Sequence, residues 1–260
     1  MSNEREILYG RQPILEALRA GRRTFHALWV AESAKGAIVA ETRAEASRRG
    51  VPVHPCAKAQ LDRLTHSGHH QGVALEAGPY PYEDPETMRR AAELAGEPLW
   101  LLFLDHIHDP QNLGSILRSA EAAGAHGVVL PRDRAALVTP AAARASSGAC
   151  EHLRVARVPN LAEAMEEWKR RGLRLIGLEA TPSAPLLTDI PLDGPLGLAV
   201  GNEGEGLGKR VAKTCDLLVR LPMRGHVQSL NAAVSAAIAL YETRRQRDTQ
   251  TRAAIGERSA

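Results

Sequence analysis

The stretch between residues 99 and 130 limits the fold more than any other part of the sequence. Residues 99–104 are a continuous apolar run of the kind that forms a buried strand, and another such run begins at Gly127. Between the two runs, apolar residues recur at helical spacing over residues 110–124. A helix that connects two strands in this way places them parallel in one sheet. Similar strands and helices alternate as far as residue 243, so we expect an α/β fold with a mostly parallel sheet and helices on both of its faces.

Composition divides the chain into four segments. Residues 1–78 have the pattern of a small α/β domain, and the proline-rich residues 79–97 that follow are typical of a linker, within which residues 85–95 allow one helical segment. The long alternation of strands and helices predicts a second domain over residues 98–245. Residues 246–260 lack apolar periodicity, so we expect a flexible tail there.

The overall composition excludes several classes of protein. Of the 260 residues, 44% are hydrophobic, which is sufficient for packed cores. The cysteines, Cys56, Cys150 and Cys215, lie far apart, so neither a disulfide framework nor a zinc site is expected and a reducing compartment is indicated. No apolar stretch approaches the roughly 20 residues that a membrane span needs, and the first residues lack a signal core. We therefore expect a cytoplasmic protein without a membrane partner.

Asn112 and Arg118 lie at the junction where an α/β protein often binds a phosphate. A dinucleotide-binding turn needs G-x-G-x-x-G at such a strand-to-helix junction, whereas this junction has one glycine, Gly114. A nicotinamide-dependent dehydrogenase is therefore a remote alternative. Asn112 has a simpler interpretation as the N-cap of the helix. The residues alone leave the roles of Asn112 and Arg118 open.

Two later buried strands are each followed by an unusual loop. The first loop, GNEGEGLGKR, departs from a nucleotide-binding phosphate loop, because Glu203 and Arg210 stand where that loop needs Gly and Ser or Thr. Its glycines and acids suit a ligand without a phosphate chain, or one with a positive centre. The second loop, LPMRGHVQSLN, ends with Ser229 and Asn231 beside a helix start, where both are suitable N-caps.

Three motifs in the chain, in this order, resemble those of a known enzyme family. They are D-P-x-N-x-G-x-x-x-R at residues 109–118, G-N-E-G-x-G-L at residues 201–207 and L-P-M-x-G-x-V-x-S-L-N at residues 221–231. The chain thereby resembles the SpoU (TrmH-type) RNA ribose 2′-O-methyltransferases of the SPOUT superfamily. Residues 9–77 are similar to the L30e-like substrate-binding domain of the branch that acts on ribosomal RNA. The resemblance covers nearly the whole chain except the tail.

The resemblance implies a fold, a cofactor and a set of site residues. It implies a deep trefoil knot in the C-terminal domain, a homodimer, and S-adenosylmethionine bound in the knotted loops without a metal. The residues that match the family's cofactor site are Gly201, Leu221, Leu230, Asn202 and Thr181. The residues that match its reaction and RNA-holding set are Arg118, Asn112, Glu203, Ser229 and Asn231.

Arg118 matches the residue for which the family suggests a general base. A guanidinium normally has a pKa above about 12, so it is charged at neutral pH and is a poor proton acceptor. The alternative is that Arg118 holds a neighbouring RNA phosphate and stabilises the alkoxide that develops on the ribose. We favour this second interpretation.

The predicted function is methyl transfer from S-adenosylmethionine to the 2′-hydroxyl of a guanosine in 23S ribosomal RNA. Family members that act on transfer RNA generally lack the L30e-like domain, which favours ribosomal RNA. The excess of positive charge also lies in this domain, since residues 1–78 contain eleven Lys and Arg against eight Asp and Glu. The alternatives are transfer RNA, another 23S site including one that confers antibiotic resistance, and a non-catalytic RNA-binding assembly factor.

Overall fold

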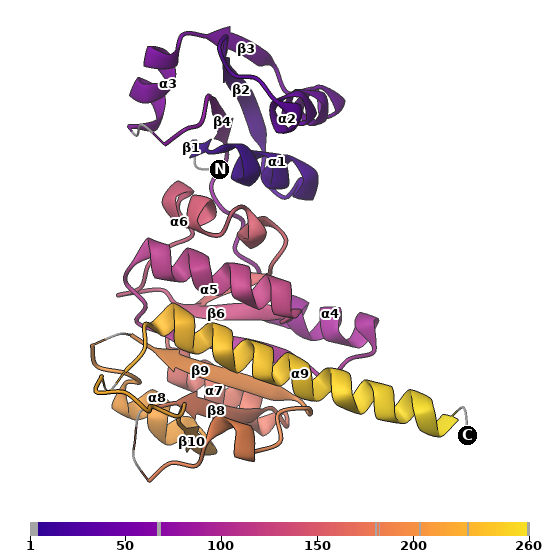
Figure 1. Cartoon of the computed structure of the whole chain (residues 1–260), viewed down its shortest axis with the longest axis vertical. Helices are drawn as coiled ribbons and strands as arrows, with labels where there is room; N and C mark the ends of the chain where they lie inside the picture. Colours follow the sequence, from indigo (N-terminus) through magenta and orange to yellow (C-terminus); the bar gives the residue numbers. More distant parts are fainter. Residues whose placement is uncertain are drawn as a thin grey trace. The chain divides into compact units, whose positions relative to one another are not determined.

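The chain folds into two compact units (Figure 1). The first unit contains residues up to Pro81 together with Leu113–Arg118 and Leu137–His152. The second unit contains Tyr82–Asn112, Ser119–Ala136 and the chain from Leu153 onward. The first unit thus takes in two segments that lie beyond the domain boundary expected at residue 78. The computed structural model describes residues 5–66, 69–179, 181, 183–202, 204–227 and 229–258.

The first unit is built on a four-stranded sheet with the strand order β1-β4-β2-β3. Its strands are β1 (Glu6–Tyr9), β2 (Phe25–Ala31), β3 (Val53–Cys56) and β4 (Val73–Ala77). β4 pairs antiparallel with both β1 and β2, whereas β2 and β3 are parallel. Its helices are α1 (Arg11–Ala20), α2 (Ala37–Arg48), α3 (Lys58–Thr65) and α6 (Pro140–Ala145), with the short 3-10 helix η1 (Ala149–Glu151).

Apolar patterns in the first unit predict strands at residues 27–30, 51–56 and 71–77 but predict neither β1 nor α3. β1 has four residues, of which only Leu8 is buried, so the strand is too short to show a period of two. α3 buries only Leu61 and Thr65. Leu61 packs into a small cluster with Ala31, Cys56 and other residues of the sheet. The position of α3 is therefore determined by tertiary packing and not by a strong helical pattern.

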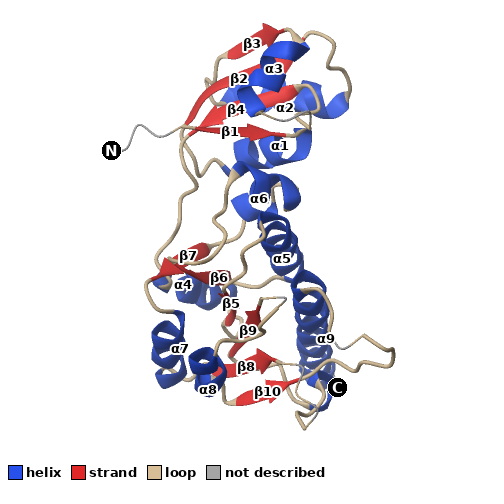
Figure 2. Cartoon of the chain, turned by 90° about the vertical axis from the view of Figure 1, so that its left-hand side faces the viewer, coloured by secondary structure: helices blue, strands red, loops and turns tan. Residues whose placement is uncertain are grey.

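The second unit contains a six-stranded sheet of order β10-β8-β9-β5-β6-β7, and each neighbouring pair of these described strands is parallel. Its strands are β5 (Trp100–Asp105), β6 (Gly127–Pro131), β7 (Val155–Val158), β8 (Arg174–Leu178), β9 (Leu196–Gly201) and β10 (Leu217–Val219), and the 3-10 helix η2 (Leu187–Asp189) precedes β9. One face of the sheet is covered by α4 (Glu86–Ala95), α7 (Leu161–Arg170) and α8 (Lys209–Thr214), and the other by α5 (Pro110–Ala123) and α9 (Ala232–Arg258) (Figure 2). The predicted α/β fold is confirmed. The trefoil knot stays a prediction.

The segments that the sequence assigned to a linker and to a tail both contain helices. The expected linker contains α4, whose Met88 is fully buried in a core cluster with Leu101 and Phe103. Only Met88 and Ala92 of α4 are buried, and the helix lies within residues 85–95, where the sequence allowed a helical segment. The tail expected from residue 246 is instead a continuation of α9 to Arg258. Neither α9 nor any other described helix is long and apolar enough to cross a membrane.

Polar contacts explain why α9 continues beyond residue 245. Arg247 donates to the carbonyl oxygens of Pro98 and Gly194 at 2.8 and 2.7 Å. Its guanidinium lies over the ring of Trp100, 5.0 Å from the ring centroid, and burial lowers its pKa to about 10. Gln246 accepts a hydrogen bond from an amide of the second unit at 2.9 Å. Contacts of this kind leave no apolar periodicity, which is why the sequence predicted a tail.

His126 should make the stability of the second unit depend on pH. The Trp100 amide donates to Nδ1 of His126 at 3.0 Å, so this ring nitrogen carries no proton. Burial lowers the pKa of His126 below its ordinary value of 6.5. As the pH decreases through 6.5, the unfolded chain binds a proton that the folded chain does not. We therefore expect the free energy of unfolding to decrease over that range.

The control for this prediction is the His126→Gln variant. It should be less stable than the wild type at about pH 7.5, and the difference should shrink towards about pH 5, because only the wild type then loses stability through this ring. Thermal unfolding of both proteins over a pH series measures the difference. A difference in stability between the two proteins that stays constant across the pH series would contradict the assignment of this pH dependence to His126.

Candidate active site

A pocket of about 350 Å³ lies at the carboxyl ends of three neighbouring strands of the second unit. β8 ends at Leu178, β9 at Gly201 and β10 at Val219, and all three residues line the pocket. In open parallel sheets this edge is where ligands bind. The volume is within the range of small-molecule sites. The remaining lining residues are Glu179, Val200, Asn202, Gly204, Glu205, Gly206, Arg220, Leu221, Met223, Ser229, Leu230, Ala232 and Ser235.

The loop after β9 folds back tightly on the end of its strand. Asn202 forms a bridge with Gly206. A Cβ atom on Gly201 would lie 2.0 Å from the carbonyl oxygen of Gly206, which is closer than any real contact of that kind. Gly206 has a φ of +68°, in the region that favours glycine. The close approach of loop and strand therefore depends on glycine at both positions.

Side-chain oxygens accept hydrogen bonds from the amides of this loop. Asn202 Oδ1 accepts from the amides two and three residues ahead of it, at 2.9 and 2.8 Å. Glu179 Oε2 accepts from the amide of Leu207 at 3.1 Å, and Asp105 Oδ2 accepts from that of Gly208 at 2.7 Å. A phosphate-binding loop directs such amides at its ligand instead. The geometry agrees with the interpretation that this glycine-rich loop does not bind a phosphate chain.

Most residues predicted for the cofactor site line this pocket. Thr181 is not among the lining residues, whereas Glu179, whose carbonyl oxygen accepts from the Thr181 amide at 2.8 Å, is. Both residues belong to the strand end that the sequence had placed near the cofactor. The predicted residues in the pocket wall are Gly201, Asn202, Leu221 and Leu230.

Asn112 and Asn231 lie together although 119 residues separate them in the sequence. Asn231 Nδ2 donates to Asn112 Oδ1 at 3.0 Å. Asn231 Oδ1 also accepts from the amide of Ala233 at 2.9 Å, so Asn231 both caps α9 and holds Asn112. The interpretation of Asn112 as an N-cap is wrong, because Asp109 caps α5 by accepting from the amides of Gln111 and Asn112 at 3.0 and 3.3 Å.

The other predicted reaction residues lie in different parts of the chain. Ser229 lines the pocket. Arg118 is exposed and belongs to the first unit, where its Nη1 donates to Ser147 Oγ at 2.9 Å. Glu203 lies outside the described residues. Within the described ranges, no group of three or more His, Cys, Asp or Glu side chains is placed to hold a metal ion.

Sequence reasoning missed two polar residues that shape these sites. Asp105 is 1% exposed and holds the loop after β9 through Gly208. The only sequence signal for Asp105 is a charged residue directly after a buried strand. In the stretch RASSGACEHLRV, residues 144–155, the sequence favours a structural role for Ser147, yet its hydroxyl accepts a hydrogen bond from Arg118. The sequence signal for Ser147 was the resemblance of the stretch RASSGACEHLRV to a family stretch.

Matches to family models identify the chain. The model of the SpoU rRNA methylase family matches residues 100–241, and the model for RNA 2′-O ribose methyltransferase substrate binding matches residues 7–83. The chain belongs to the SpoU rRNA methylase family. The first model spans the whole six-stranded sheet of the second unit, and the second spans the four-stranded sheet of the first unit except the start of β1.

Similar proteins support this membership. YacO of Bacillus subtilis strain 168, which bears the name of a TrmH family tRNA/rRNA methyltransferase, is 39% identical over 250 residues, covering 95% of this chain and 98% of YacO. The crystal structure of the SpoU methyltransferase AviRb from Streptomyces viridochromogenes, in complex with the cofactor AdoMet, aligns with a TM-score of 0.78 and 27% identity over 94% of this chain and 91% of that one. A structure described for 2-OH methylation of C/U34 on tRNA aligns with a TM-score of 0.52 and 30% identity over 57% of this chain and 96% of that one.

As a member of this family, the chain is an RNA 2′-O-ribose methyltransferase that uses S-adenosylmethionine. The pocket fits that cofactor chemically. Leu221 and Leu230 provide apolar wall for an adenine ring, and Glu179 and Glu205 provide negative charge for a ligand with a positive sulfur and a positive amine. A Cβ atom at Gly201 would occupy space at the end of β9, in the wall of this pocket.

Proposed function

We propose that this SpoU methyltransferase transfers a methyl group from S-adenosylmethionine to the ribose 2′-hydroxyl of a guanosine in 23S ribosomal RNA. The observation that carries the proposal is the pair of asparagines beside the pocket. Ser229 lines the pocket, and two residues later Asn231 caps α9 and holds Asn112. Polar groups suited to a ribose thus lie next to a pocket suited to the methyl donor.

The reaction is an in-line displacement, in which the ribose oxygen bonds to the methyl carbon as the bond from that carbon to sulfur breaks. S-adenosylmethionine supplies an activated methyl group on a positively charged sulfur. The protein contributes mainly alignment, which can supply much of the rate of such a step. In the proposed site, the amides of Asn112 and Asn231 orient the ribose, and the tight loop after Gly201 shapes the pocket.

Besides alignment of the reacting atoms, the reaction requires that the ribose hydroxyl lose its proton, and Arg118 is the residue that we assign to this requirement. A neutral alcohol is a poor nucleophile, so negative charge must develop on the ribose oxygen as its proton passes to water. We assign to Arg118 the binding of the adjacent phosphate and the stabilisation of that charge. Its planar set of N–H donors fits oxygen ligands while the group stays charged.

Ribosomal RNA is the substrate that the extra length of this chain favours. The tRNA-modifying protein aligns over 96% of its own length with only 57% of this chain. This chain therefore contains a long segment that the tRNA-modifying protein lacks. Residues 7–83 of this chain match the family model for RNA 2′-O ribose methyltransferase substrate binding. An additional RNA-binding domain suits a large, folded RNA. The name of YacO includes both tRNA and rRNA, so transfer RNA is the alternative substrate.

A second pocket, of about 520 Å³, lies in the first unit and supports an RNA partner. Its lining includes Arg11, Lys58 and Ser33 but no Asp or Glu. Arg11 Nε donates to the carbonyl oxygen of Gln71 at 3.0 Å, which fixes the guanidinium at the pocket wall. Two positive charges and a hydroxyl suit a backbone phosphate. We propose that this pocket holds a phosphate of the RNA substrate.

Lys58→Ala should weaken binding of a 23S ribosomal RNA fragment about three- to tenfold at about 0.1 M salt, and should reduce the salt dependence by about one counterion. Arg63→Ala is the matched control, because it removes one positive charge from the same helix, α3, outside the pocket lining. Fluorescence anisotropy over a salt series measures both variants. Equal effects of the two substitutions would argue for a diffuse basic surface instead of this pocket.

The experiment that tests the function is transfer of labelled methyl from S-adenosylmethionine to total ribosomal and transfer RNA. The wild type is compared with Arg118→Ala, and primer extension at limiting nucleotide maps any 2′-O-methylated position. A stop in 23S RNA that the variant lacks would support reaction and substrate together. Label only in transfer RNA would refute the substrate, and no label in any RNA would favour a non-catalytic assembly factor.

We also propose that the protein acts as a cytoplasmic homodimer. α9 exposes Val234, Ile238 and Tyr241, which are 47%, 43% and 55% accessible in the single chain. Their spacing of four and three residues places them on one face of the helix. An exposed apolar face of this kind suits a second copy of the chain.

A further inference from the structure

Arg118 is bound by a serine with an unusual backbone conformation. Ser147 Oγ accepts a hydrogen bond from Arg118 Nη1 at 2.9 Å. Ser147 has a φ of +53°, in the left-handed region that few residues other than glycine occupy. Such a conformation persists only where the surrounding structure enforces it, and it is often found at functional sites.

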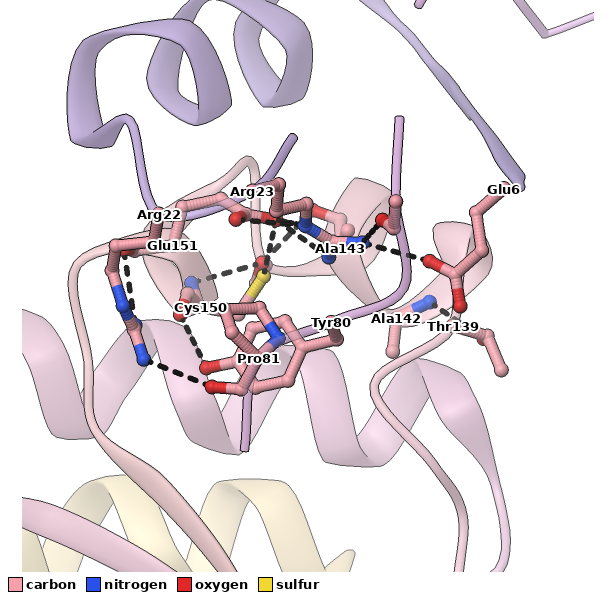
Figure 3. Close-up of polar contacts among 12 residues, drawn as sticks. Glu6, Arg22, Arg23, Tyr80, Pro81, Thr139, Ala142, Ala143, Cys150 and Glu151 are labelled. Carbon is pink, nitrogen blue, oxygen red and sulfur yellow. Dashed lines mark hydrogen bonds and ion pairs between the residues drawn. The ribbon is translucent and has the colours of Figure 1, made fainter. Parts of the chain in front are cut away.

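A buried ion pair anchors the chain just after Ser147. The carboxylate of Glu151 accepts hydrogen bonds from Arg23 Nε and Nη2 at 2.8 to 3.1 Å, and both side chains are almost fully buried (Figure 3). Burial alone lowers the pKa of Arg23, but the hydrogen bonds to Glu151 and Glu6 raise it overall, so the guanidinium stays charged. The hydroxyl of Tyr80 also donates to the carbonyl oxygen of Cys150 at 2.8 Å (Figure 3). Removing one partner of such a pair is costly, which keeps η1 in place.

The two neighbours of Ser147 are held as well. A Cβ atom on Gly148, which has a φ of +86°, would lie 2.7 Å from Glu16 Cβ and 3.0 Å from Pro13 Cα, so α1 packs directly against this residue. Ser146 is fully buried, and its hydroxyl donates to a carbonyl oxygen of α6 at 2.8 Å. Ser147 is therefore fixed from both sides, while its own hydroxyl remains available to Arg118.

We propose that Ser147 is a positioning residue that directs the guanidinium of Arg118 towards the RNA. The inference rests on the proposed function, since the direction of Arg118 matters only if this residue acts on RNA. An exposed arginine samples many rotamers, and holding one of them before the RNA binds reduces the entropy lost in reaching the transition state. A hydroxyl can accept this bond without neutralising the guanidinium, as a carboxylate would, so the charge remains available for a phosphate.

Ser147→Gly is the most informative variant, because glycine adopts a φ of +53° without strain and lacks the hydroxyl. We expect kcat for methyl transfer to RNA to fall about tenfold or more, because the loss of one hydrogen bond to a charged group has an effect of this size. The KM for S-adenosylmethionine should stay unchanged, and the melting temperature should equal or exceed that of the wild type. Unchanged kcat in an equally stable protein would overturn the proposal.

Ser146→Ala is the matched control, since it removes the neighbouring hydroxyl, which bonds only within this segment in the contacts described above. It should lower the melting temperature and leave kcat unchanged at a temperature where the variant is folded. A second readout does not need activity. The Nη–H signals of Arg118 in a 15N NMR spectrum recorded at low temperature, identified by their loss in Arg118→Lys, should shift in Ser147→Gly.

The two readouts separate this inference from the proposed function. An Arg118 signal that does not move in Ser147→Gly overturns the positioning role, whatever the activity. A signal that moves in a protein whose wild type methylates no RNA supports the contact and refutes the proposed function. A moved signal together with reduced kcat supports both.

Discussion

Arg118→Lys is expected to lower the rate of methyl transfer to RNA by about 100-fold or more. Lysine keeps the positive charge but has a single ammonium in place of the planar set of N–H donors, so it cannot bind Ser147 and a phosphate in the same geometry. If Arg118 instead removed the hydroxyl proton, lysine should serve at least as well, because its ordinary pKa of about 10.4 is lower than that of arginine. The single-turnover rate at saturating S-adenosylmethionine and RNA measures the chemical step directly.

Arg90→Lys is the control for this substitution, because Arg90 is an exposed residue of α4 outside the proposed sites. It should react at the rate of the wild type. Arg118→Lys itself should keep its melting temperature and its affinity for S-adenosylmethionine, since Arg118 does not line the pocket of the second unit. A rate near that of the wild type in Arg118→Lys would contradict phosphate binding and favour proton removal.

The parallel sheet of the second unit could be predicted because its central strands are buried on both faces. Every residue of β5 and of β9 is buried, and such strands appear in the sequence as continuous apolar runs. β1 buries only one residue, so it produces no pattern above the background, whereas α4 lies within residues 85–95, where the sequence allowed a helical segment. The end of α9 depends on the polar anchoring of Arg247, which no apolar period reveals.

The candidate site could be predicted only through motifs. The resemblance placed Gly201, Leu221 and Leu230 near a cofactor, and all three line one pocket. It did not identify the bond between Asn112 and Asn231, because 119 residues separate them and only the folded chain brings them together.

The anchor of Ser147 could not be predicted for the same physical reason. Arg23 and Glu151 lie 128 residues apart, and a buried ion pair has no periodic or compositional signal. The left-handed backbone of Ser147 is also invisible in the sequence, since serine rarely adopts it. Both features follow from packing within the first unit.

Gly201→Ala should abolish binding of S-adenosylmethionine, whereas Gly204→Ala in the same loop should leave it nearly intact. A Cβ on Gly201 would lie 2.0 Å from the Gly206 carbonyl oxygen and 2.5 Å from the amide nitrogen of Leu207. Both are backbone atoms, so the whole loop after β9 would have to move out of the pocket wall. A Cβ on Gly204 would meet only Asn202 Oδ1 at 3.6 Å, which is an ordinary contact.

Isothermal titration of both variants with S-adenosylmethionine measures this difference. We expect the Kd to rise about 100-fold or more for Gly201→Ala, which corresponds to roughly 2.7 kcal/mol, and less than about twofold for Gly204→Ala. A folded Gly201→Ala protein with the affinity of the wild type would mean that the cofactor binds outside this pocket. Equal losses in both variants would mean that the freedom of the loop, and not the close approach of its backbone to β9, determines cofactor binding.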